Sequence, residues 1–399
     1  MGAVSSHDEG AAPLPVPLPL CTGPPGPPSV SRSFVSTTDV ATAEPAAHPA
    51  PATGGSRRKS GGLGRYLLVR FLLIFPTVFI LVTVVFVLMR STGDPITAAL
   101  GGRLTPDQLH QRIHAAGYDK PIFVQYLSYL GGIVRGDFGT TITDHRPVTQ
   151  VLTTFGSATL ELAVYALLVA FLIGIPLGRI AAARRDKAPD AALRVSAILA
   201  YATPVFFAGM VLKLVFAVWL NVLPVAGRAT TRSILTMKTQ GAGTGIYLID
   251  AISTGDGAVI SDVLRHAVLP ALALGLLTAG VFLRLVRTNV IGTLQTGYVE
   301  AARSRGVSER RLLRTHAWRP ALVPIITVIG LQVAMLLGGA VLTETTFEWK
   351  GLGFQLVQYL LARDFVAVQG MVALLAVIVA VTNFVVDVIA ALVDPRIRY

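Results

Sequence analysis

The chain alternates between long apolar runs and short polar segments, and this pattern predicts a bundle of membrane-spanning helices. Beyond residue 62, six apolar runs are long enough to cross about 30 Å of hydrocarbon as helices. They lie at residues 66–89, 158–180, 195–220, 267–287, 325–345 and 371–393. The predicted fold is therefore an all-α integral membrane protein with six transmembrane helices.

The first 62 residues have a different composition. They are rich in Pro, Ala, Gly and Ser and contain almost no aromatic residues. Such a segment buries too little apolar surface to offset the entropy of ordering it, so we expect a disordered tail. We favour a nonfunctional extension or an over-extended gene start over a Pro-rich partner motif. Residues 63–399 are the predicted transmembrane domain.

Basic residues set the predicted orientation of the spans. They are dense in "SRRKS", in "AAARRDKAPDAALR", in residues 288–324 and in the end "DPRIRY", and sparser in the other connecting segments. Because cytoplasmic loops carry the excess of Lys and Arg, both termini are predicted to be cytoplasmic. This asymmetry accounts for the net charge of +12. We therefore expect the basic residues to contact membrane lipid, and we expect no nucleic-acid partner.

Signatures of catalysis and of metal binding are absent from the sequence. It contains no G-x-x-x-x-G-K-[ST] and no H-E-x-x-H, and its seven His residues are scattered. The single cysteine, Cys21, excludes a Cys-based metal site within the chain. We expect no catalytic residue, no metal site and no cofactor bound by this chain.

One charged stretch between two predicted spans stands out, "YVEAARSRGVSERRLLRTHAWRPALVP". Gly306 fits the residue that ends a first short helix, and Ser308 fits the N-cap of a second. Small and charged side chains on this segment suit a partner surface. They are Glu300, Ala301, Ala302, Arg303, Arg305, Arg310 and Arg311. The residues alone favour partner docking and contact with anionic lipid equally.

The same stretch carries a resemblance to a known family. "EAARSRG" resembles the EAA motif of membrane subunits of bacterial ABC importers, and residues 65–399 resemble the dipeptide/oligopeptide/nickel permeases. The wider motif has a proline where this chain has Arg319, and proline follows at Pro320. The supporting stretches, in chain order, are "GDP", "GDFG", "TLELA", "YLIDAISTGD", "LRHAVLPALAL", "TETTFEWKGLG", "ARDFVAVQG" and "DPRIR".

The resemblance implies a type I ABC importer permease of the bacterial cell membrane that forms half of a translocation pathway for dipeptides or oligopeptides. It implies as partners a second homologous permease, two ATPase subunits or a fused pair, and an extracytoplasmic substrate-binding protein. ATP and Mg²⁺ would bind to the ATPase subunits. Residues 288–324 would be the loop that couples to them. Import of nickel chelate or glutathione is one alternative, and a membrane sensor or scaffold that recruits a cytoplasmic partner is another.

Polar residues inside the apparent spans are further candidates. Asn383 and Asp387 share one helix face, and we favour hydrogen bonds between helices over substrate contact for both. Gln332 either faces a water-filled path or holds helices together. For Glu161 and Lys213, near span ends, we favour contact with lipid headgroups. Arg184, Arg185 and Lys187 are interpreted as topology residues rather than a second partner contact.

Overall fold

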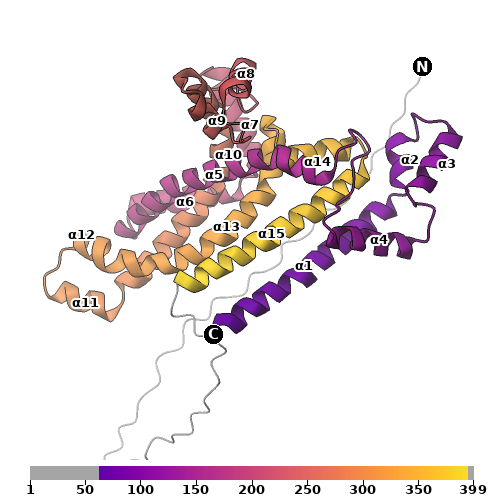
Figure 1. Cartoon of the computed structure of the whole chain (residues 1–399). Coiled ribbons are helices and arrows are strands. Elements are labelled where there is room, and N and C mark those ends of the chain that lie inside the picture. The colour runs from indigo at the N-terminus through magenta and orange to yellow at the C-terminus, as the bar shows by residue number, and fades with distance from the viewer. Residues whose placement is uncertain (1–62, 394–399) are drawn as a thin grey trace, which may run out of the picture. The chain divides into compact units, whose positions relative to one another are not determined.

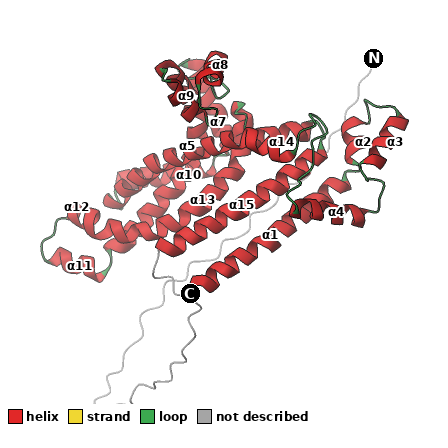
Figure 2. Cartoon of the chain, in the orientation of Figure 1, coloured by secondary structure: helices red, strands yellow, loops and turns green. Residues whose placement is uncertain are grey.

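The computed structural model describes residues 63–393, and nearly all of the regular structure in this part of the chain is helical (Figure 1; Figure 2). The predicted tail and the "DPRIRY" end lie outside the described residues.

Four helices of the described part are long and apolar enough to cross a membrane. They are α1 (Leu63–Ser91), α5 (Val148–Ala183), α10 (Gly257–Leu294) and α15 (Phe365–Val393). Each contains one of the predicted spans. The predicted span 325–345 lies within α13 (Trp318–Phe347), a 30-residue helix that is not among these four.

The predicted span at 195–220 is not one continuous helix, because the helix breaks inside it. α6 (Ala188–Ala202) is followed by α7 (Val205–Leu212) and the π-helical η1 (Lys213–Trp219), bent by 105° from α6. Pro204 lacks an N–H and forces the preceding residue into extended backbone, as the ψ of 124° at Thr203 shows. Counting the bent pair as one span gives five among the described residues, so the count of six stays a prediction.

Shorter helices fill the connections between the long ones. α2 (Pro95–Leu100), α3 (Pro106–Ala115) and α4 (Ile122–Val134) connect α1 to α5. α8 (Thr231–Gln240) and α9 (Tyr247–Thr254) pack on each other at one end of α10 (Figure 1). α14 (Leu352–Leu361) packs on both α13 and α15.

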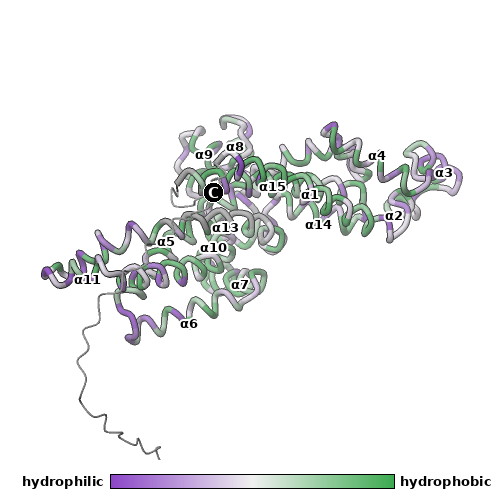
Figure 3. Tube along the Cα trace, turned by 90° about the horizontal axis from the view of Figure 1, so that it is seen from below, coloured by the Kyte–Doolittle hydropathy of each residue, from purple (hydrophilic) through white to green (hydrophobic). Residues whose placement is uncertain are grey.

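At the other end of α10, three helical pieces connect it to α13 (Figure 1). They are α11 (Gly297–Ser304), α12 (Glu309–Arg311) and the π-helical η2 (Leu312–Ala317). Figure 3 shows α1 and α15 as largely hydrophobic and α3 and α11 as largely hydrophilic. Charged helices therefore lie beyond the ends of the apolar ones.

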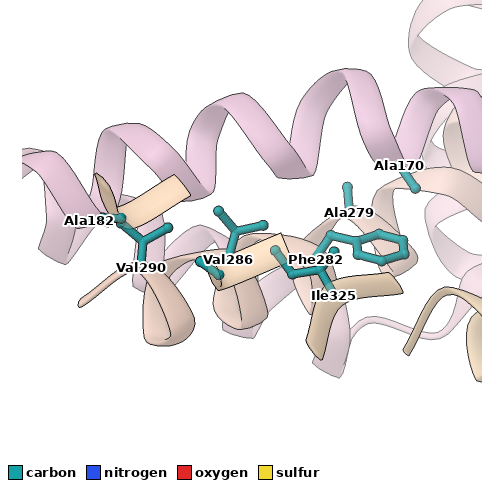
Figure 4. Packing of buried hydrophobic residues seen from close by; sticks show 9 residues of the cluster. Ala170, Ala182, Ala279, Phe282, Val286, Val290 and Ile325 are labelled. Carbon is teal, nitrogen blue, oxygen red and sulfur yellow. The ribbon is translucent and has the colours of Figure 1, made fainter. Parts of the chain in front are cut away.

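The most extensive helix pair joins α5 to α10 through small residues. A Cβ placed on Gly178 would lie 2.7 Å from the Cβ of Val286 and 2.8 Å from the carbonyl oxygen of Leu283. Only glycine allows the two backbones to come this close. Figure 4 shows the core that results, in which Ala182 of α5 faces Val290 of α10.

Candidate functional site

The turn between α11 and α12 is built around a left-handed glycine. Gly306 has a φ of +79°, and its N–H donates to the carbonyl of Arg303 at 2.9 Å. The N–H of Val307 donates to the carbonyl of Ala302 at 3.3 Å, which completes a Schellman motif. The prediction that Gly306 ends the first helix is confirmed. Ser308 takes the extended backbone of an N-cap, as predicted, although its side chain makes no capping hydrogen bond.

The predicted partner surface is open to solvent. Two fully buried residues, Val299 and Leu312, anchor the loop from below. Ala302 is half-buried, and the other residues singled out in the sequence are exposed, namely Glu300, Ala301, Arg303, Arg305, Gly306, Arg310 and Arg311. The loop thus combines a charged, solvent-exposed surface with two buried apolar residues.

One ion pair closes the turn. Arg303 Nε lies 2.7 Å from Oε1 of Glu309, so the pair bridges the two helices on either side of Gly306. The hydrogen bond to the Glu309 carboxylate raises the pKa of the Arg303 guanidinium. An exposed pair of this kind adds little stability. The ion pair instead fixes the orientation of the Arg303 and Glu309 side chains.

The loop is joined to the helix bundle at several points. The hydroxyl of Tyr298 donates to the carbonyl of His316 at 3.1 Å, and Pro320 has no N–H with which to satisfy that carbonyl. The guanidinium of Arg179, on α5, lies 4.6 Å from the ring centroid of Trp318. Arg319, where the chain departs from the family pattern, is exposed. α11 is therefore joined to η2, which leads into α13, by a side-chain hydrogen bond as well as by the chain itself.

A depression of about 680 Å³ lies beside the loop. Glu300, Arg303 and Arg310 line it together with Arg184 and Arg185 from the end of α5. We had interpreted the last two as topology residues. The structure places them beside the charged loop, whereas Lys187 does not line the depression.

The sequence analysis missed a buried ion pair at the start of α6. Asp190 is fully buried, and both of its oxygens accept from Arg287 of α10, at 2.6 Å from Nε and 2.8 Å from Nη2. The backbone N–H of Asp186 donates to the same carboxylate at 3.0 Å. The connection that carries Arg184 and Arg185 is therefore held to the helix that leads into α11. The sequence signal that could have revealed this pair was Asp190, an acidic residue in a segment dense in basic residues.

The polar residues inside the apparent spans have different environments. Asp387 pairs with Arg70 of α1, with Oδ2 3.3 Å from Nε, which agrees with a role between helices. Asn383 is exposed. Gln332 is buried, and its Nε2 lies 3.9 Å from the sulfur of Met335. The structure does not bring these three side chains together into one site.

Headgroup contact is wrong for Glu161, which lies buried within the first half of α5. Its carboxylate forms a short ion pair with the equally buried Arg228. It also accepts from the hydroxyl of Tyr165 at 2.8 Å and from the N–H of Leu248 at 2.9 Å. The Arg228 guanidinium in turn lies 3.6 Å from the ring centroid of Tyr247. The segment that carries α8 and α9 is thereby fixed to α5.

Lys213 is half-buried and contacts another helix, and headgroup contact for it stays a prediction. Its ammonium donates to the carbonyl of Thr346 at 2.7 Å and lies 5.5 Å from the ring centroid of Phe347. Both residues belong to the end of α13, so Lys213 holds η1 against that helix. For both residues the partner lies far away in sequence, which the sequence analysis could not show.

Comparison with protein-family models gives two matches that together cover most of the described chain. A model described as the binding-protein-dependent transport system inner membrane component matches residues 174–399. A model of the N-terminal part of such membrane components matches residues 63–163.

Curated proteins of similar sequence match nearly along their whole length. The di/tripeptide transport system permease of Pseudomonas aeruginosa is 38% identical over 329 residues, 82% of this chain and 96% of the relative. The dipeptide transport system permease of Escherichia coli K12 is 38% identical over 339 residues, 84% and 99%. Bacillus subtilis has an oligopeptide transport system permease that is 31% identical over 84% of this chain.

A solved structure of the MetNI methionine ABC transporter, in inward-facing conformations, has a chain with a TM-score of 0.46 and 16% identity. It covers 62% of this chain and 97% of its own. This similarity is too low to support an assignment by itself.

Proposed function

Because the chain belongs to the family of binding-protein-dependent transport system inner membrane components, we propose that it is the permease subunit of an importer for dipeptides or oligopeptides. The family consists of transporter subunits rather than enzymes, and the chain is a multi-pass protein of the bacterial inner membrane. The observation that carries the proposed substrate is the 38% identity to two dipeptide permeases over more than four fifths of this chain.

The loop formed by α11, α12 and η2 is the proposed contact to a separate ATPase subunit. Its charged face is exposed, as such a contact requires, and the side chains of Ala301 and Ala302 leave room for a close approach. Its position in the chain supports a mechanical role, because the loop directly connects the C-terminal end of α10 to the start of α13. Movement of a bound partner would then tilt two long helices together.

The second element of this contact is the depression beside the loop. Arg184 and Arg185 line it with Arg303 and Arg310, so four guanidinium groups border one hollow that also has Glu300 and Glu309 on its wall. Such an arrangement suits a partner whose surface carries both carboxylates and cations. The buried Asp190–Arg287 pair would keep both basic elements at a fixed spacing as the helices move.

The complete importer would contain further chains. We include a second homologous permease, two ATPase subunits or a fused pair, and an extracytoplasmic substrate-binding protein. ATP and Mg²⁺ would be bound by the ATPase subunits, and their hydrolysis cycle would drive alternating access in the two permeases. This chain contributes helix movement and a path, and no covalent chemistry.

Uptake by a strain that lacks this gene tests the proposed substrate. Radiolabelled dipeptides, a longer peptide and nickel would be supplied separately to the parent, the deletion strain and the deletion strain carrying the gene on a plasmid. We expect dipeptide uptake to fall on deletion and to return with the plasmid, while the empty plasmid restores nothing. Unchanged peptide uptake together with loss of nickel uptake would assign the chain to the metal.

A further inference from the structure

A cavity of about 400 Å³ lies at the C-terminal end of α1. None of its lining residues belongs to the loop of α11, α12 and η2 that we propose as the ATPase contact. The last turns of α1, the connection between α3 and α4, α4 itself and the start of α15 form its walls. Arg90, Lys120 and Asp137 supply charges to the lining. Phe86 and Phe138 supply apolar surface. The cavity therefore offers cations, a carboxylate and an apolar wall to one occupant.

One nitrogen of the Arg90 guanidinium has no hydrogen-bond partner in the part of the chain that the structure describes. Its Nη2 donates to the carbonyl of Tyr118 at 3.2 Å, and its guanidinium lies 5.0 Å from the ring centroid of Tyr118. Its Nη1 is buried and has no hydrogen-bond partner among the described residues. A buried charged donor without an acceptor is costly, so an acceptor from outside the chain is called for.

The neighbouring backbone is held so that Lys120 stays at the cavity. Gln125 is buried, and its Nε2 donates to the carbonyl of Tyr118 at 3.0 Å and to that of Lys120 at 2.6 Å. The ring of Phe86 stacks on that of Tyr129 with 5.6 Å between centroids, which orders the wall between α1 and α4. The backbone that carries Lys120 is thus held in place before any ligand binds, while the Lys120 side chain itself is exposed.

The surroundings of the cavity indicate a lipid. Val87 and Leu88, one turn before Arg90, are 57% and 54% exposed, and Ile122 and Phe123 of α4 are 62% and 68% exposed. Large apolar side chains that are this exposed at the end of a membrane-spanning helix lie against acyl chains. An arginine at that depth meets the phosphate groups of the adjacent leaflet.

We propose that this cavity binds the zwitterionic headgroup of a membrane phospholipid, with its phosphate at Arg90 and Lys120 and its ammonium at Asp137. Because Nη1 of Arg90 is buried in the structure, the guanidinium shifts toward the cavity when the lipid binds, and there it donates to a phosphate oxygen. Asp137 makes the site prefer phosphatidylethanolamine over a lipid whose headgroup has no cation. This inference does not depend on the transported substrate.

Native mass spectrometry of the full chain, purified in detergent and titrated with phosphatidylethanolamine, tests the site. Arg90→Gln should weaken binding about tenfold, since a hydrogen bond to a charged group is lost. Arg135→Gln is the matched control, because Arg135 is exposed just beyond α4 and does not line the cavity. Equal binding by the parent chain and both variants would overturn the proposal. Lys120→Gln, at an exposed residue, gives a second reading if Arg90→Gln does not fold, and it should also weaken binding.

Two further arms separate the lipid from other sources of the same chemistry. Asp137→Asn should abolish the preference for phosphatidylethanolamine over phosphatidylglycerol, and it should not weaken the binding of phosphatidylglycerol, because a repulsive carboxylate is removed. Inorganic phosphate at millimolar concentration should not compete with the lipid. Full competition by inorganic phosphate would make this a site for a free anion and would refute the lipid assignment.

Discussion

At the scale of single residues, Gly306 shows how one backbone angle shapes the proposed contact. The loop turns because this residue adopts a φ of +79°, and nothing lies within 4 Å of the position that a Cβ would take. A substitution there is therefore opposed by backbone strain alone, since no neighbour would be displaced. The exposed charges on either side depend on that turn for their relative positions.

Gly306→Ala should destabilise the turn by about 1–2 kcal/mol through the left-handed backbone alone. Hydrogen exchange at the N–H of Val307, which donates to Ala302, should become about tenfold faster. Gly297→Ala is the matched control, because Gly297 has equal free space and no left-handed φ. Exchange that is equally fast in both variants and in the parent chain would contradict the role given to the turn.

Residues differ in how far the sequence alone reveals them. The turn at Gly306 could be predicted because its cause is local, a glycine between two charged helical segments. The position of Glu161 could not, because its partner Arg228 is 67 residues away and belongs to a segment with no apolar pattern. A lone carboxylate at the end of an apolar run has the same local sequence whether it meets headgroups or a buried arginine.

At the scale of helices, the contact between α5 and α10 depends on glycine at the points of closest approach. Gly178→Val should clash with Val286 and with the Leu283 carbonyl and cost at least about 1–3 kcal/mol. The thermal unfolding midpoint of the chain in detergent, with the fraction recovered as a single species, measures this. Gly292→Val in α10 is the control, since nothing lies within 4 Å of its Cβ position. Equal losses in the two variants would show that helix packing is not the cause.

Helix ends and breaks were predicted less well than helix positions. Long apolar runs predicted α1, α10 and α15 because a span needs such a run. α5 begins at Val148, well before the predicted 158, and in its first turns Val148 and Val151 are buried while the polar residues between and after them are exposed. The break at Pro204 was missed because hydropathy alone does not distinguish a straight span from a bent pair.

At the scale of the whole molecule, the charged loop and the segment with α8 and α9 lie at opposite ends of α10 (Figure 1). α10 also packs on α5, α6 and α13, so a movement at one end is shared by the bundle. The proposed importer needs this arrangement, because force would be applied at the loop while substrate arrives at the far end.

Glu300→Lys should leave membrane insertion intact and uncouple the importer. Reversing the charge on the exposed face of α11 places a wrong charge against the ATPase subunit, so uptake should fall about tenfold or more while ATP hydrolysis continues. Uptake and hydrolysis would be measured together in membrane vesicles. Asp107→Lys, the same reversal on exposed α3, should change neither. Normal uptake by Glu300→Lys would remove the loop from the coupling path.

The buried pair of Glu161 and Arg228 also bears on the order in which the chain assembles. The two residues are 67 positions apart, so at about 5–20 residues per second the ribosome adds Arg228 several seconds after Glu161. During that interval the carboxylate has no cation to meet, and its helix is already apolar enough to enter the bilayer. We therefore expect α5 to reach its final position only after the segment with Arg228, α8 and α9 has been added to the chain.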